Sequence, residues 1–122
     1  MKKILSFLSL SMALFISNCA APQQAASAFS TESFKVSGVC GMCKKRIETA
    51  AYAISGVKTA TWNAEKQALE VVFDTKKASN EAIQKRVAAT GHDTEKVKAD
   101  DNAYGRLPNC CKYRDGVEVH EN

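Results

Sequence analysis

Two cysteines, Cys40 and Cys43, stand two residues apart in the stretch "GVCGMCKKRIE". Such a pair can bind a soft metal ion, exchange a disulfide with another thiol, or close a structural disulfide. Soft thiolates suit Cu(I), whereas a structural Zn(II) site normally takes four protein ligands, and this motif supplies two. The pair therefore favours Cu(I) binding, with the two disulfide uses as alternatives.

A second pair, Cys110 and Cys111, follows near the C-terminus. Ten residues separate Asp100 from Cys110, and an extended chain of that length reaches about 30 Å. The C-terminal segment is thus long enough to return to Cys40 and Cys43 and complete a site of three or four thiolates. It can equally form its own metal site or a structural disulfide, because these four cysteines allow three pairings.

The elements that position the cysteines follow from the spacing of apolar residues. Alternation predicts strands in "SFKVSGV", "VKTATWN" and "ALEVVFD", and a weaker strand in "DTEKVKA". Apolar residues at spacings of three and four predict a helix in "CKKRIETAAYAI". A second helix is predicted from a cap at Ser79 or Asn80 to Gly91.

This order of strand, helix, strand, strand, helix and strand predicts an α+β fold of the ferredoxin-like βαββαβ type. Right-handed crossovers then give a four-stranded antiparallel sheet with two helices on one face. A cysteine-containing C-terminal tail follows this domain.

The first cysteine pair falls at the junction between the first strand and the first helix. Residues three apart at a helix start point to the same side, so Cys40 and Cys43 can converge on one ion. The unpaired backbone N–H groups at this position favour negative charge, and the neighbouring Lys44, Lys45 and Arg46 add to the effect. We therefore expect a lowered pKa for both thiols, which supplies the thiolate form that binds metal.

Residues 1–18 are predicted to be a signal peptide, so the protein is expected to be exported. Two lysines precede an apolar run over residues 4–16, which is too short to span a bilayer. Cys19 directly follows this run, as in a bacterial lipoprotein signal, and a lipidated Cys19 would anchor the protein to a membrane in the periplasm. The alternative is cleavage at the small-residue stretch "ASA" of residues 26–28.

The remaining chain predicts one small domain over residues 33–99, reached through a flexible tether of residues 19–32 and followed by an extension of residues 100–122. Without residues 1–18 the chain carries 15 basic and 13 acidic side chains, a net charge of +2. This imbalance is too small to indicate a nucleic-acid partner. With no nucleophile-elbow motif present, we expect no enzymatic activity and no small-molecule substrate.

The stretch from "FKVSGVCGMCKKRIETAAYAISGV" to "AATGHD" resembles the heavy-metal-associated domain family of copper chaperones, metal-pumping ATPases and periplasmic mercury-binding proteins. The resemblance rests on the Cys-x-x-Cys at the strand-to-helix junction, the "GV" before the second strand, and the corner formed by Gly91 and His92. The family usually has a methionine two residues before the first cysteine. This chain has Gly38 there, which leaves the choice of metal open.

The resemblance implies a protein that carries or sequesters a soft metal ion. Cu(I) is expected first, with Zn(II), Cd(II) or Hg(II) as alternatives. The expected partner is a metal-transporting ATPase or another metal-binding protein. In the family, the corner that His92 occupies often carries a residue that tunes the metal site, so His92 is either a third ligand or a surface residue that caps the helix. Met42 is expected to pack as a loop residue, with its thioether as an alternative soft ligand.

These inferences converge on an exported, periplasmic heavy-metal-binding protein. The alternative is a thiol-disulfide redox protein that uses the same Cys-x-x-Cys pair, as thioredoxin-like proteins do. Neither of the two prolines, Pro22 and Pro108, lies near that pair, and the element order also differs from the thioredoxin-like one. The candidate metal ligands are Cys40, Cys43, His92, Cys110 and Cys111.

Overall fold

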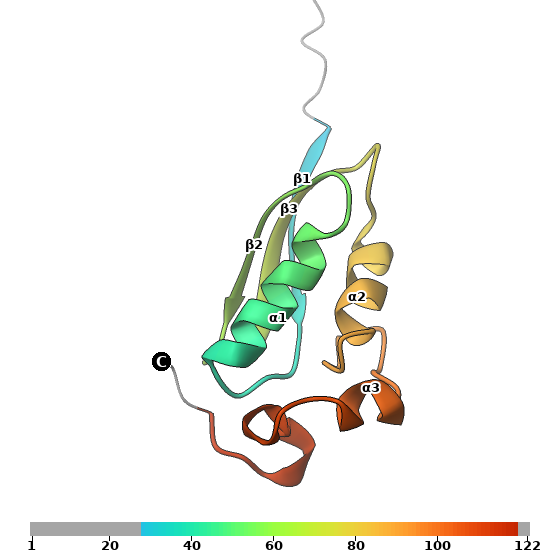
Figure 1. The fold of residues 1–122 in the computed structure, drawn as a ribbon. Helices are drawn as coiled ribbons and strands as arrows, with labels where there is room; N and C mark the ends of the chain where they lie inside the picture. The colour runs from blue at the N-terminus through green and yellow to red at the C-terminus, as the bar shows by residue number, and fades with distance from the viewer. Residues whose placement is uncertain (1–27, 120–122) are drawn as a thin grey trace, which may run out of the picture.

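The computed structural model describes residues 28–119, so the predicted signal peptide and Cys19 lie outside the described part of the chain. Figure 1 shows two helices packed along a sheet, with a short third helix and two turns of 3-10 helix in the extension. The elements are β1 (Phe29–Lys35), α1 (Gly41–Tyr52), β2 (Val57–Asn63), β3 (Ala68–Asp74), α2 (Asn80–Ala88), α3 (Asp101–Gly105), η1 (Asn109–Cys111) and η2 (Tyr113–Asp115).

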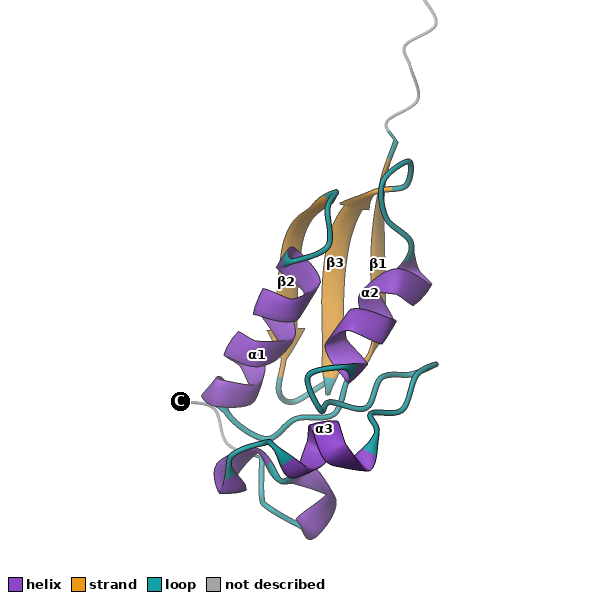
Figure 2. Ribbon diagram, turned by 45° about the vertical axis from the view of Figure 1, so that its right-hand side comes forward, coloured by secondary structure: helices purple, strands orange, loops and turns teal. Residues whose placement is uncertain are grey.

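β3 is the central strand of the described sheet and pairs antiparallel with β1 on one side and with β2 on the other. Alternate residues of β3 are buried, namely Leu69, Val71 and Phe73, as the two-residue period of a strand requires. They form one core with Ile47 of α1 and Ile83 of α2. Both helices cover the same face of the sheet (Figure 2), which confirms the predicted α+β arrangement of two helices on one face of an antiparallel sheet.

The fourth strand predicted at "DTEKVKA" is not confirmed, because the described sheet has three strands. This segment makes a single antiparallel bridge, between Val36 and Thr94. Thr94 then turns the chain, since its N–H and its hydroxyl donate to the carbonyl oxygen of Val97 at 2.8 and 2.9 Å. The N–H of Lys96 donates to the side chain of buried Gln84 at 2.8 Å. Side chains therefore satisfy backbone groups that a longer strand would pair.

β1 begins at Phe29, so the sheet includes part of the segment predicted as a tether, residues 19–32. The carbonyl oxygen of Ala28 accepts hydrogen bonds from both the N–H and the hydroxyl of Thr75, each 2.7 Å long. Glu32 accepts a hydrogen bond from Asn80, the first residue of α2. These polar contacts explain why a polar stretch extends the strand.

The extension after α2 folds back across the ends of α1 and α2 where the chain enters α1 (Figure 1). Asp100 caps α3, and its side chain accepts the N–H of Ala103 at 2.7 Å. Gly91 permits the close approach of α3, because it has a φ of +105°, and a Cβ atom there would lie 2.8 Å from the carbonyl oxygen of Ala103. The same Cβ would lie 2.9 Å from Cγ of Leu107. The extension is thus packed on the domain as part of its structure.

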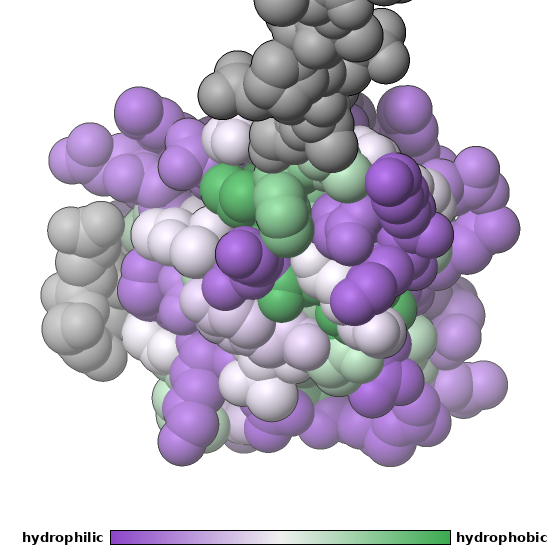
Figure 3. Space-filling view, turned by 90° about the horizontal axis from the view of Figure 1, so that it is seen from above, coloured by the Kyte–Doolittle hydropathy of each residue, from purple (hydrophilic) through white to green (hydrophobic). Residues whose placement is uncertain are grey.

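The surface farthest from the extension is mainly hydrophilic, with some apolar side chains beside the start of the described chain (Figure 3). Within residues 28–119, no helix combines the length and the apolar character needed to cross a membrane. Four large apolar side chains are exposed in the described part of the chain, and a few such residues are normal for a small domain. They are Phe29, Met42, Tyr52 and Val119.

We predict that Gly91→Ala destabilises the protein by about 1–3 kcal/mol, because the new Cβ both strains the backbone and collides with α3. Gly105→Ala is the matched control, since no atom lies within 4 Å of a Cβ built at Gly105. Urea unfolding of the two reduced variants measures the difference. Equal unfolding free energies for the two variants would show that the extension does not pack closely on Gly91.

Candidate metal centre

Cys40 and Cys43 lie at the start of α1, as the sequence predicted. Cys40 is the N-cap residue with an extended backbone, and its carbonyl oxygen accepts the N–H of Lys44 at 3.0 Å. Cys43 lies in the first turn, and its Sγ atom is 3.6 Å from Sγ of Cys40. Both cysteines are buried, with 3% and 0% of their surfaces exposed. The pair therefore converges, but beneath the surface rather than on an exposed loop.

The extension brings the second cysteine pair to the first. Sγ of Cys111 lies 3.7 Å from Sγ of Cys40 and 4.0 Å from Sγ of Cys110. The sulfurs of Cys40, Cys110 and Cys111 all lie within 4.8 Å of one another. With metal–sulfur bonds of about 2.3 Å, sulfurs that share one ion lie about 3.8 to 4.6 Å apart. The observed spacing of free thiols thus fits a shared ion after small shifts.

The route of the extension differs from the one expected from a fourth strand. Such a strand would have ended at the pole opposite Cys40, whereas the turn after Thr94 returns the chain to the cysteine end of the sheet. The N–H of Ala99 donates to Oδ1 of Asp93 at 2.8 Å, which closes this return. The distance to Cys40 is consequently short, and the chain reaches it as α3 and η1 instead of in an extended conformation.

The three buried thiols differ in acidity. Burial raises the pKa of Cys40, but hydrogen bonds from the backbone of Cys43 and Met42 and from neighbouring thiols outweigh it and leave the pKa below its usual value. Burial raises the pKa of both Cys43 and Cys111. The expectation of a lowered pKa for both Cys40 and Cys43 was therefore wrong for Cys43, because desolvation outweighs the helix start there.

Arg114 fixes the extension to the domain. Its guanidinium pairs with Asp93 at 2.7 Å and with Asp101 at 3.1 Å, and it donates to the carbonyl oxygen of Ala99 at 2.8 Å. Burial raises the pKa of Asp93, but the hydrogen bonds from Arg114 and Ala99 hold it below its usual value. The guanidinium also lies 4.4 Å from the ring centre of Tyr104. This role of Arg114 could not be predicted from the sequence, because its partners lie in separate segments.

His92 is not one of the three grouped thiol ligands. Its side chain is fully buried, and its Nδ1 lies 2.8 Å from the carbonyl oxygen of Ser37, which immediately precedes the cysteine loop. Its ring stacks on Tyr113 at 5.7 Å, and burial lowers its pKa. The hydroxyl of Tyr113 donates to the carbonyl oxygen of Gly91 at 2.7 Å. His92 therefore joins the loop to the extension and is not a surface cap. Its role as a ligand stays a prediction, since its buried Nε2 has no hydrogen-bond partner among the described residues.

Trp62 explains the glycine that replaces the family's usual methionine. The indole is almost fully buried beneath the cysteine loop and donates its Nε1–H to the carbonyl oxygen of Val36 at 3.0 Å. A Cβ at Gly38 would lie 2.9 Å from the Trp62 ring and 3.1 Å from Cβ of Cys43. A methionine there would displace the indole, so the packing of Trp62 beneath the loop favours glycine at this position.

Met42 takes a position on the other side of the loop. Its side chain is 51% exposed, and the thiol of Cys110 lies 3.5 Å from its sulfur. The structure thus brings Met42 to the exposed edge of the cysteine group, while Cys43 and Cys111 form its interior.

Comparison with known proteins identifies the family of the domain. Residues 33–93 match the heavy-metal-associated domain, and the chain belongs to this family. No curated protein matches the chain.

Three solved structures show the same fold. The CopZ metallochaperone is 32% identical, with a TM-score of 0.52 over 53% of this chain and 98% of its own. Oxidized MerP from Ralstonia metallidurans CH34 is 25% identical, with a TM-score of 0.52 over 55% of this chain and 94% of its own. A copper-binding domain from the P-type ATPase HMA7 is 26% identical, with a TM-score of 0.52 over 53% of this chain and 89% of its own. The match to the family ends before the extension that contains Cys110 and Cys111.

We predict that Arg114→Ala loosens the extension and exposes Cys111, because the variant removes two ion pairs and a hydrogen bond to Ala99 that hold the extension on the domain. The measurement is the alkylation rate of Cys111 in reduced, metal-free protein, read by mass spectrometry, and we expect an increase of about tenfold. Arg106→Ala is the matched control, since Arg106 is exposed in the same extension and makes no ion pair among the described residues.

Acid should loosen the extension in the same way. The folded pKa of Asp93 is depressed, so its contribution to the stability of the folded extension is complete above the unfolded pKa of about 3.9 and is lost as the pH falls through the folded pKa.

Unchanged alkylation of Cys111 in the Arg114→Ala variant would contradict the role given to the ion pair between Arg114 and Asp93.

Proposed function

We propose that this protein binds a soft metal ion, Cu(I) in preference, and carries or sequesters it without catalysis. The observation that carries the proposal is the convergence of four free thiols at the start of α1, with Sγ–Sγ distances of 3.6 to 4.0 Å between successive members. Thiolates at this spacing suit a soft ion of low coordination number. The family and the copper-binding neighbours support the same assignment.

The resident ligands in this proposal are the three buried thiols of Cys40, Cys43 and Cys111. Cys40 lies between the other two and is the first to lose its proton, because its pKa is the lowered one. Cys43 and Cys111 have raised pKa values, so an ion must displace their protons to bind. Soft ions such as Cu(I), Cd(II) and Hg(II) form the strong thiolate bonds this requires, whereas a fourth thiolate for Zn(II) would have to come from exposed Cys110.

The N-terminal pattern supports export and a lipid anchor at Cys19, and loss of membrane fractionation in a Cys19→Ala form tests the anchor. The neighbours include a metallochaperone and a domain of a P-type ATPase. We infer that the partner is a metal-transporting ATPase or another metal-binding protein.

A thiol-disulfide redox protein is the rival function. The lowered pKa of Cys40 and its 3.6 Å distance to Cys43 suit that chemistry. However, a redox nucleophile must be reachable by the disulfide that it attacks, and only 3% of Cys40 is exposed. Turnover of a disulfide substrate by metal-free protein with a dithiol reductant would favour the rival.

We predict that Cys40→Ser and Cys43→Ser each remove tight Cu(I) binding, because each deletes a ligand from the start of α1. The double variant Cys110→Ser/Cys111→Ser should bind Cu(I) more weakly by about 1–3 kcal/mol, as neighbouring groups in one network typically couple. Competition titration of reduced protein against a chromophoric Cu(I) chelator measures all three. If the double variant loses all binding while Cys40→Ser retains it, the primary ligands are Cys110 and Cys111 and the assignment is wrong.

A further inference from the structure

The sulfur atoms of the site form a continuous series from the surface to the interior. The sulfur of Met42 lies 3.5 Å from Sγ of Cys110, which lies 4.0 Å from Sγ of Cys111. Sγ of Cys111 lies 3.7 Å from Sγ of Cys40, which lies 3.6 Å from Sγ of Cys43. Each step is short enough for one ion to contact two successive sulfurs at once.

Exposure falls along this series. Met42 is 51% exposed and Cys110 is exposed, whereas Cys40, Cys43 and Cys111 are 3% exposed or less. A donor or acceptor of the ion therefore meets Met42 and Cys110 first. The three buried thiols follow Cys110 in the series of sulfur contacts.

We propose that Met42 and Cys110 form a loading subsite, from which Cu(I) passes through Cys111 to the buried thiols of Cys40 and Cys43. This inference rests on the proposed function, since it assigns a path to the same ion. It gives Met42 and Cys110 a role in the rate of exchange and leaves equilibrium affinity to the buried thiols.

The transfer balances without any oxidant or reductant. Copper remains Cu(I) throughout, so no electrons are transferred. Binding at the surface breaks the bonds between copper and its donor and forms bonds to the thioether of Met42 and the thiolate of Cys110, whose proton goes to water. The bonds to Met42 and Cys110 then break as bonds to the buried thiols form. When the ion advances to Cys111, the Cys111 proton moves to the Cys110 thiolate that the ion leaves. The remaining thiol protons reach solvent by the same outward path.

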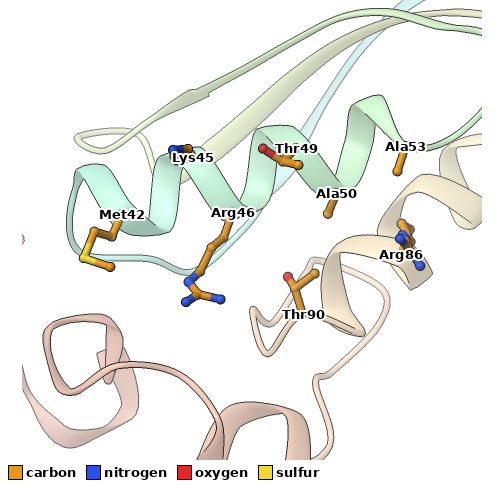
Figure 4. A pocket seen from close by; sticks show the side chains of 8 residues that line it. All are labelled: Met42, Lys45, Arg46, Thr49, Ala50, Ala53, Arg86 and Thr90. Carbon is orange, nitrogen blue, oxygen red and sulfur yellow. The ribbon is translucent and has the colours of Figure 1, made fainter.

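The surroundings of Met42 suit a negatively charged donor. Met42 lies at one end of a groove of about 470 Å³ between α1 and α2, beside the extension (Figure 4). Lys45, Arg46 and Arg86 line this groove, and no acidic side chain does. A Cu(I) ion held by two thiolates carries a net negative charge, so these cations attract such a complex toward Met42.

The test measures loading rates and affinities separately. Reduced protein is mixed in a stopped-flow instrument, without oxygen, with the Cu(I)–bicinchoninate complex, and the loss of chelator colour is followed. Met42→Leu keeps the size of the side chain and removes the thioether, and Cys110→Ser removes the thiol. Asn109→Ser is the matched control, because Asn109 is an exposed neighbour in η1 without sulfur.

We expect Met42→Leu and Cys110→Ser each to slow loading by about tenfold, since a ligand used only on the path changes the barrier and not the end states. Their equilibrium affinities should fall by less than their loading rates do, and Asn109→Ser should match the unaltered protein in both measurements. Loading of both variants at the unaltered rate overturns the subsite. A loss of affinity equal to the loss of rate also overturns it, because the residue is then a resident ligand. Failure of the unaltered protein to take Cu(I) overturns the proposed function itself, and the subsite with it.

Discussion

Asp93 is the residue through which the two cysteine-bearing segments are fixed to each other. Its carbonyl oxygen accepts the N–H of Ser37 at 2.9 Å, at the start of the cysteine loop. Its carboxylate accepts hydrogen bonds from the N–H of Ala99 and from the guanidinium of Arg114, and its own N–H donates to the hydroxyl of Tyr113 at 2.8 Å. Asp93 thus fixes the positions of the cysteine loop, the turn and the extension relative to one another. The sulfur distances between the two cysteine pairs depend on these positions.

Burial of the thiols beneath the extension affects both how tightly the site binds an ion and how easily the ion can exchange. The extension brings a third sulfur beside Cys40, but burial raises the pKa of both Cys111 and Cys43. Metal binding must then displace protons from buried groups, which favours ions with strong bonds to sulfur. A fully covered site would exchange its ion slowly. The exposed edge at Met42 lets a covered site remain reachable.

Most of the fold could be predicted from the sequence, whereas for the site only the separate cysteine motifs could be. Alternation and helical spacing predicted the two helices and the antiparallel strands, because those patterns reflect one buried face. The predicted fourth strand is not confirmed. The side chains of Gln84 and Thr94 form hydrogen bonds with backbone groups of that segment that a strand would have paired. The cysteine pairs were visible as motifs, whereas their meeting depends on Asp93 and Arg114, 21 residues apart. Gly38 was visible as a departure from the family, but its cause, the Trp62 ring beneath the loop, lies on another strand.

The central claim is that the extension supplies a third sulfur to an ion held at the start of α1. X-ray absorption at the copper edge of Cu(I)-loaded, reduced protein tests this claim most directly, because it counts the sulfur neighbours of the ion. The account predicts three sulfur neighbours in the unaltered protein and two in a Cys111→Ser variant. Two sulfur neighbours in both proteins would contradict it, and would leave the extension as a cover that takes no part in binding.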